Sequence, residues 1–252
     1  MSTVIQAENL TKLYSNKRGV QNITFSLQSG EAFGLLGANG AGKTTVMKIL
    51  TGLVNQSEGT ASLFDFDINN NRKSALSSVG AIIEAPVFYG YLSIYKNLKL
   101  AASYYPEITD INAEIKDVLS KVNLWDFRKD KAERLSLGMK QRLGLALAMI
   151  GKPKLYILDE PTNGLDIEGR VDIRNIIIDL SKNKDTAFLI SSHLPEEIEK
   201  TCNKVGVIKE GRMIDVQDMS YIFENYPSLE DYYLNKIGSR TELNASAGKD
   251  VV

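Results

Sequence analysis

Hydrophobic residues in the first part of the chain follow two different spacings. Residues 4–14 and 22–37 either alternate between apolar and polar side chains or are continuously apolar, and they include β-branched and aromatic residues. This pattern predicts β-strands. From Gly42 onward the spacing becomes helical, and one face collects the apolar residues Val46, Ile49, Leu50 and Leu53. The segment 30–53 is therefore predicted to form a strand, a glycine-rich loop and a helix, in that order.

The middle of the chain has helical periodicity. Residues 93–105 and 110–122 read as amphipathic helices, and the second keeps its apolar residues on one face. A third helix is predicted from about Gly138, with Ser136 as its N-cap. Together these segments predict a helical insertion at about residues 85–150.

Strand-like patterns return after the insertion. Residues 155–159 and 186–193 are short apolar runs followed by turn or helix signals, as buried parallel strands are. A helix is predicted between them at residues 171–182. After residues 205–214 we expect order to weaken, and from about Arg240 the small polar residues predict a mobile tail.

Composition and charge exclude several classes of protein. The 252 residues allow one large domain with a sizeable insertion. Thirty Lys plus Arg against 31 Asp plus Glu give a net charge of -1, so no nucleic-acid partner is expected. The single Cys202 excludes an internal disulfide and a cysteine-based zinc site. The longest apolar run, residues 143–151, is too short to cross a bilayer, and the N-terminus lacks a signal-peptide core, so we expect a cytosolic chain.

A glycine-rich loop carries the first candidate chemistry. Residues 37–44 (GANGAGKT) match the pattern G-x-x-x-x-G-K-[ST], in which backbone N–H groups close around a phosphate chain. The lysine would reach the β- and γ-phosphates, and the following threonine hydroxyl would bind Mg²⁺. The residues expected to bind the nucleotide are Gly37, Asn39, Gly40, Ala41, Gly42, Lys43, Thr44 and Thr45.

Two carboxylates and a histidine follow two of the predicted strands. Asp159 and Glu160 end an apolar run, where an α/β fold would deliver them to the phosphate site. Asp159 suits the Mg²⁺ shell, and Glu160 suits a general base that deprotonates the attacking water. His193, the only histidine, ends another run and would contact the γ-phosphate, whereas taken alone it would be read as a structural or surface residue in preference to a functional one.

These residues, together with SLGMKQR at 136–142, LDEPTNGLD at 158–166 and SSH at 191–193, resemble the ATP-binding subunit of an ABC transporter over about residues 4–220. The resemblance implies an α/β fold: a P-loop NTPase core of the ABC ATPase type, with an antiparallel β subdomain and a helical insertion. It implies the division 1–84 and 151–220 (core), 85–150 (helical subdomain) and 221–252 (extension and tail).

The resemblance also suggests roles for residues outside the phosphate loop. Tyr14 would stack on adenine, or be a half-buried strand tyrosine. Ser136 and Gly138 would contact the γ-phosphate of a nucleotide held by a second subunit, so two copies would pair head to tail. Asp166 would link the two sites, although alone it is an ordinary helix N-cap.

The sequence departs from the family pattern at two places. The usual signature LSGGQ reads LSLGM here, so Leu137 and Met139 replace a glycine and a glutamine. Glu84 stands where the family has a glutamine that touches Mg²⁺, as in the lantibiotic-immunity and bacitracin-resistance branch. A carboxylate binds Mg²⁺ more strongly than an amide, so Glu84 is a candidate metal ligand; the alternative is a solvent-facing loop residue.

The function implied by the resemblance is an ATP- and Mg²⁺-dependent motor of an exporter for an antimicrobial peptide, held at the membrane by a separate permease. Aromatic residues between 86 and 105 would receive a helix of that permease, or pack in the core. Two alternatives remain open: an ABC-type ATPase that acts on nucleic acid or the ribosome, and a nucleotide-gated assembly factor.

Overall fold

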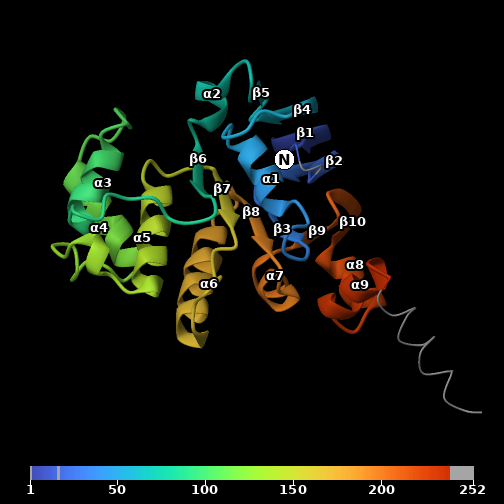
Figure 1. The fold of residues 1–252 in the computed structure, drawn as a ribbon. Coiled ribbons are helices and arrows are strands. Elements are labelled where there is room, and N and C mark those ends of the chain that lie inside the picture. Colours follow the sequence, from blue (N-terminus) through green and yellow to red (C-terminus); the bar gives the residue numbers. More distant parts are fainter. Residues whose placement is uncertain (1, 16–17, 239–252) are drawn as a thin grey trace, which may run out of the picture.

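The structure, a computed structural model, describes residues 2–15 and 18–238 and contains two β-sheets (Figure 1). The larger has the strand order β10-β9-β3-β8-β7-β6 and is parallel except for β10, which pairs antiparallel with β9. Its strands are β3 (Ala32–Leu36), β6 (Val79–Ile82), β7 (Leu155–Asp159), β8 (Ala187–Ser192), β9 (Lys204–Lys209) and β10 (Arg212–Asp218).

The smaller sheet is antiparallel, with the order β2-β1-β4-β5. Its strands are β1 (Thr3–Leu13), β2 (Gly19–Gln28), β4 (Glu58–Leu63) and β5 (Phe66–Asp67). Buried and more exposed positions are mixed along β1 and β2, whereas β3, β7 and β8 are buried at every position. This contrast is expected, because parallel strands covered on both faces read as continuous apolar runs.

The helices form three groups around the sheets (Figure 1). Four lie along the core: α1 (Lys43–Leu50), α2 (Arg72–Leu76), α6 (Ile167–Ser181) and α7 (Pro195–Thr201). The helical lobe on one side comprises α3 (Ile94–Ala102), α4 (Ile111–Lys121), the short 3₁₀ helix η1 (Ala132–Arg134) and α5 (Leu137–Met149). On the opposite side α8 (Met219–Asn225) and α9 (Leu229–Lys236) follow β10.

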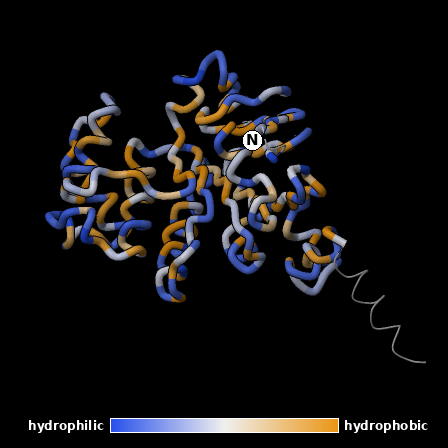
Figure 2. Tube along the Cα trace, in the orientation of Figure 1, coloured by the Kyte–Doolittle hydropathy of each residue, from blue (hydrophilic) through white to orange (hydrophobic). Residues whose placement is uncertain are grey.

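Two hydrophobic clusters hold these layers together. One joins the helical lobe, α6 and α9 to the larger sheet, and the other fills the space between that sheet, α1 and the antiparallel sheet. Neighbouring residues of the central strands point to opposite clusters: Leu36, Leu158 and Ile190 to the first, Leu35, Ile157 and Leu189 to the second. Figure 2 shows the central strands hydrophobic and the outer ends of the helices hydrophilic. The larger sheet thus packs against one hydrophobic cluster on each of its two faces, and this packing holds the ends of its strands in place.

The predicted helices of the insertion are confirmed, together with their starts. The side chains of Ser93, Asp110 and Ser136 accept hydrogen bonds from the backbone N–H three residues on, which caps α3, α4 and α5. The helix predicted from Val171 begins earlier, at Ile167. Because each cap lies within three residues of the N–H group that it accepts from, the starts of these helices can be predicted from the local sequence.

The prediction that order weakens after residues 205–214 is wrong. Residues 219–225 and 229–236 form α8 and α9, and α9 packs against α7. Tyr232 is fully buried, and Lys236 pairs with Asp215 of β10. Each helix buries only two side chains, so the hydrophobic periodicity of its sequence is weak even though the helix packs against the rest of the fold. The tail predicted from Arg240 lies outside the described residues.

Candidate functional site

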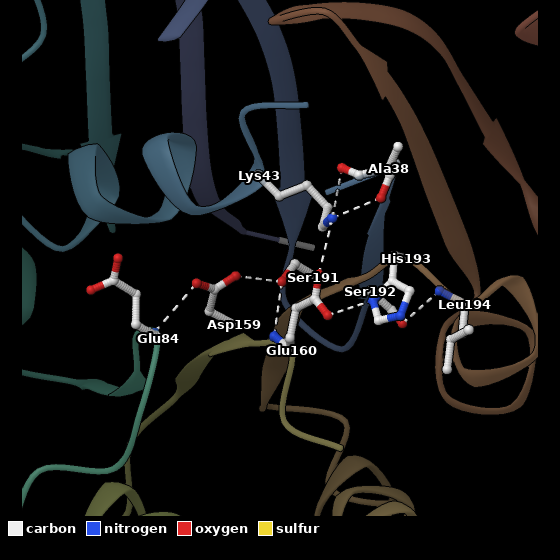
Figure 3. A network of polar contacts seen from close by, with 10 residues as sticks. Ala38, Lys43, Glu84, Asp159, Glu160, Ser191, Ser192, His193 and Leu194 are labelled. Atoms are coloured by element: carbon white, nitrogen blue, oxygen red, sulfur yellow. Dashed lines mark hydrogen bonds and ion pairs between the residues drawn. The ribbon is translucent and has the colours of Figure 1, made fainter. Parts of the chain in front are cut away.

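The candidate residues of three neighbouring strands meet at one edge of the larger sheet. The glycine-rich loop follows β3, the carboxylates stand at the end of β7, and His193 follows β8. Because β3, β8 and β7 are adjacent and parallel, their carboxyl ends bring these segments together (Figure 3). The sheet order therefore assembles groups that are up to 156 residues apart (37 to 193).

The glycine-rich loop has no room for larger side chains at two positions. A Cβ added at Gly37 would lie 2.4 Å from the Ile208 carbonyl oxygen. Gly42 has φ +110°, and a Cβ there would lie 2.5 Å from a Val20 methyl group. Gly42 is also the N-cap of α1 and has no side chain to cap it. The first N–H groups of α1 thus remain for an anion, as in other phosphate-binding loops.

Lys43 is buried, and its ammonium group donates hydrogen bonds to two carbonyl oxygens and forms an ion pair with one carboxylate. Its Nζ lies 2.7 Å from the Gly37 carbonyl oxygen, 3.2 Å from that of Ala38 and 3.0 Å from Glu160 Oε1 (Figure 3). The side chain is only 5% exposed, and that of Glu160 only 17%. An ammonium group has three donors and no more. A phosphate that binds Lys43 therefore competes with these partners.

Glu160 bridges the lysine and the histidine. Its second carboxylate oxygen lies 2.6 Å from His193 Nδ1. Its backbone has φ +47°, an uncommon left-handed conformation for a residue other than glycine. The Glu160 N–H donates to Ser191 Oγ at 2.9 Å, which holds this turn in place. The carboxylate is thus fixed between two possible proton or charge partners.

Ser191 is a site residue that sequence reasoning missed. Its hydroxyl is fully buried and donates to Asp159 Oδ1 at 2.6 Å. The Asp159 carboxylate is also buried, and its other oxygen accepts the Glu84 N–H at 3.3 Å. The sequence feature that could have indicated this role is the pair of serines at the end of the apolar run 186–193. Ser191 orients the carboxylate that is expected to face the metal.

Glu84 reaches the site with its backbone, whereas its carboxylate points elsewhere (Figure 3). Oε1 accepts from Lys48 Nζ at 2.7 Å, and the side chain is 64% exposed. This hydrogen bond raises the pKa of Lys48, with burial opposing it and the Glu84 charge adding to it. The sequence did not reveal Lys48 as a partner, because it lies 36 positions away on α1. Glu84 as a metal ligand stays a prediction.

The residues predicted to hold Mg²⁺ have the right chemistry for a shared site. Among the residues that the structure describes, no group of three or more His, Cys, Asp or Glu side chains is arranged to hold a metal ion. Mg²⁺ commonly takes one or two carboxylates and completes its shell with substrate phosphates and water. The buried Asp159 oxygens, and the Thr44 hydroxyl on the first turn of α1, fit that requirement.

Tyr14 is the neighbour in sequence of Leu13, which lines a cleft beside the phosphate loop. It follows the last residue of β1, and its N–H donates to the Arg18 carbonyl at 2.8 Å. A cleft of about 430 Å³ there is lined by Leu13, Asn39 and Gly40 among others. Its stacking on a base stays a prediction.

Ser136, Gly138 and Asp166 form a second group at the beginnings of α5 and α6. Ser136 caps α5, and Asp166 caps α6 by accepting the Gly169 N–H at 2.8 Å. In the described ranges, no hydrogen bond or ion pair connects this group to Lys43, Asp159, Glu160 or His193. A Cβ at Gly164 would lie 3.5 Å from Leu137, which brings the two helix beginnings side by side.

The aromatic residues between 86 and 105 divide into two sets. Phe88, Tyr95 and Tyr105 pack against the helical core, whereas Tyr89, Tyr91 and Tyr104 are exposed. The core interpretation is therefore confirmed for the first set only. In the described parts of the chain, no helix combines the length and the apolar character needed to span a bilayer.

Comparisons with known proteins agree on one family. The family model described as ABC transporter matches residues 20–163. The Bacitracin transport ATP-binding protein BcrA of Bacillus licheniformis is 40% identical, over 85% of this chain and 70% of its own. The Lantibiotic transport ATP-binding protein SrtF of Streptococcus pyogenes is 37% identical over an alignment that covers 93% of this chain and 97% of SrtF. A solved structure of the ATP binding subunit of an ABC transporter superposes with TM-score 0.82 at 26% identity, over 93% of this chain and 100% of that one.

Proposed function

The chain belongs to the ABC transporter ATP-binding proteins, and from this premise we propose that it is the ATP-driven motor of an exporter whose permease is a separate protein. It is an ATPase. One observation supports its active centre most directly: the buried chain of contacts from the phosphate loop through Lys43 and Glu160 to His193. We assign residues 1–84 and 151–220 to the catalytic core, 85–150 to the helical lobe and 221–252 to an extension.

The first step of the mechanism is phosphate binding. The N–H groups at the start of α1 and the ammonium of Lys43 bind the β- and γ-phosphates of ATP. Because Glu160 and the γ-phosphate are both negatively charged and compete for Lys43, the incoming γ-phosphate displaces Glu160 from its ion pair. Thr44 and Asp159 would hold Mg²⁺, which would neutralise charge on these phosphates.

The displaced Glu160 then acts as the general base. A carboxylate freed from its lysine accepts a proton from the attacking water more readily than one held in an ion pair. His193 Nδ1 stays within hydrogen-bond reach of the carboxylate and orients it. Ser191 keeps Asp159 directed at the metal position, so the two acids have separate tasks.

We propose that two copies, or this chain and a homologue, pair head to tail around two nucleotides. Ser136 and Asp166 are exposed and lie apart from this chain's own phosphate loop contacts. Leu137 and Ile167 beside them are exposed large hydrophobic residues, which is typical of a surface that a partner covers. Ser136 and Gly138 would then contact the γ-phosphate bound by the other copy.

We propose that the permease docks in a groove between the core and the helical lobe. A cleft of about 290 Å³ is lined by Ile83 and Pro86, and by Gly144 of α5 among others. It begins next to Glu84, and Val87 at its rim is 88% exposed. Glu84 thus lies between the proposed permease site and Asp159, where docking is able to affect the metal position.

The exported substrate is proposed from the relatives. BcrA and SrtF are named for bacitracin and lantibiotic transport, and this chain shares their family and is 40% and 37% identical to them over the aligned residues. We propose an antimicrobial peptide as the substrate class and the cytoplasmic face of the membrane as the location. Action on nucleic acid is not favoured, because the net charge is -1.

Resistance measurements test the proposal. A sensitive bacterium would express the chain with its permease, and growth inhibition would be measured for bacitracin and several lantibiotics. We expect resistance with the wild type and none with Glu160→Gln. Glu107→Gln, an exposed acid in the turn between α3 and α4, is the matched control and should retain resistance. Equal sensitivity of all three strains to every peptide would refute the substrate class, and failure to co-purify with the permease would refute the motor role.

A further inference from the structure

Helix α3 lies in the helical lobe, away from α1 and the phosphate loop (Figure 1). A basic cleft is lined by residues at the beginning of this helix. It measures about 560 Å³, and no carboxylate is among the residues that line it. Four of its lining side chains are cations and two are tyrosines: Lys96, Arg128, Lys129, Lys131, Tyr91 and Tyr95. A chain with a net charge of -1 thus concentrates four positive charges in one place.

The positive charges of this basic cleft are only weakly compensated. Within the described residues, Lys96 and Lys129 form no ion pair. Lys131 has only a loose contact of 3.7 Å with the exposed Glu133. Arg128 is held by stacking 4.3 Å above the Trp125 ring and by donating Nη1 to the Trp125 carbonyl at 2.9 Å. The cleft therefore presents a fixed guanidinium and three mobile ammonium groups to an anion.

The backbone of the basic cleft is fixed as well. Ser93 caps α3 and forms an isolated β-bridge with Lys131, and the Tyr95 N–H donates to the Arg128 carbonyl at 2.9 Å. These contacts tie the start of α3 to residues 128–131. The spacing of the cations is thus part of the fold, although the lysine side chains are exposed.

Exposed aromatic residues continue from the basic cleft. Tyr91 lines it, and Tyr89 packs edge-on against Tyr91 with 5.9 Å between ring centroids. Both rings are exposed, and so is Val87 two residues earlier. Tyrosine is enriched where proteins meet the polar surface of a membrane, because its ring is apolar and its hydroxyl is hydrated. Basic residues beside such rings match an anionic bilayer surface.

We propose that this basic cleft binds the phosphate headgroup of an anionic lipid at the membrane surface. Four weakly compensated cations suit one or two phosphate groups, and the tyrosines distinguish a bilayer surface from phosphate in solution. The cleft is confined to the start of α3 and residues 128–131, whereas a nucleic acid strand needs a longer basic track. Lipid binding would hold the helical lobe at the bilayer in addition to the permease contact.

Vesicle binding by the purified full chain, without any permease, tests this proposal independently of the transport function. The probes are liposomes of phosphatidylcholine alone and with 30 mol% phosphatidylglycerol, compared by flotation at 50 and 500 mM NaCl. We expect binding only to the anionic liposomes and only at low salt. Each removed charge should weaken partitioning about fivefold, so Lys96→Gln with Lys129→Gln should weaken it about 25-fold.

A matched double variant makes the test specific. Lys154→Gln with Lys184→Gln removes the same charge from exposed positions just before β7 and β8 and should bind as the wild type does. Circular dichroism and ATPase rates should be equal for all variants. Equal weakening by both double variants, or no binding to anionic liposomes, would overturn the proposal. Displacement by 10 mM inorganic phosphate at constant ionic strength, or tighter binding of an RNA oligonucleotide that depends on Lys96 and Lys129, would also overturn it.

Discussion

Replacing Glu160 by glutamine separates the two tasks that its carboxylate performs. The carboxylate forms an ion pair with Lys43, and during hydrolysis it is the proposed base. Glutamine keeps the shape and one acceptor oxygen but has no charge and accepts no proton. We therefore expect slower hydrolysis together with tighter ATP binding, because less is lost when Lys43 turns to the phosphate.

The magnitudes follow from the burial of the pair. A hydrogen bond to a charged group contributes about 1.5–3 kcal/mol and a neutral one about 0.5–1.5, so the substitution removes about 1–2 kcal/mol from the nucleotide-free state. The melting temperature should fall by about 2–8 °C. ATP affinity should rise about 5- to 30-fold, since the same free energy no longer opposes binding. Loss of the base should slow hydrolysis about 10²- to 10⁴-fold.

Equilibrium titration with ATP in the presence of EDTA measures affinity without turnover, and single-turnover hydrolysis with Mg²⁺ measures the chemical step. Glu107→Gln removes an equal charge from an exposed turn between α3 and α4 and should change neither quantity. The reasoning would be refuted by a variant that hydrolyses ATP at the wild-type rate. Unchanged affinity with slow hydrolysis would refute only the competition between Glu160 and phosphate for Lys43.

Three further substitutions test other parts of the site and fold. Lys43→Ala should weaken ATP binding at least tenfold by calorimetry, because charged hydrogen bonds to phosphate are lost; wild-type affinity would remove the phosphate-loop assignment. Glu84→Gln should change stability by less than about 1 kcal/mol, since its pair with Lys48 is exposed, but should shift the Mg²⁺ concentration that half-saturates ATPase activity; an identical Mg²⁺ titration would count against a metal role. Burial would raise the pKa of Asp215, but the hydrogen bond and charge of Lys236 outweigh it and hold that pKa below 3.8. Lys236→Gln should thus lower the free energy of unfolding by about 0.5–1 kcal/mol at pH 7, measured by urea denaturation. This difference from the wild type should shrink as the pH falls below about 4, because Asp215 then becomes protonated. A difference independent of pH would contradict the pairing.

The parts of the fold that sequence predicted best are those determined locally. The phosphate loop needs glycine at Gly42 because its φ of +110° disfavours a side chain, and Ser136 caps its helix by accepting a hydrogen bond from the N–H three residues on. Strands such as 155–159 are apolar throughout because both faces are covered. Such features leave a pattern in a short window of sequence.

Features that depend on residues far apart in sequence were not predictable. Nothing near Ser191 indicates that it orients Asp159, 32 positions away. The pair of Lys48 and Glu84 spans 36 positions and turns the carboxylate away from the position that its motif suggested. The helices α8 and α9 were missed because their stability comes from docking on α7 and β10 rather than from their own periodicity.

The docking of α9 has a consequence for how the catalytic unit is delimited. Helix α7 begins two residues after His193, and α9 packs on it, while Lys209 of β9 donates to the Ile237 carbonyl at 2.9 Å. All the recognisable motifs end before residue 194, so a fragment chosen by motifs would stop too early. The support that holds the histidine in register with Glu160 extends to residue 237, and the smallest independently active fragment is expected to extend equally far.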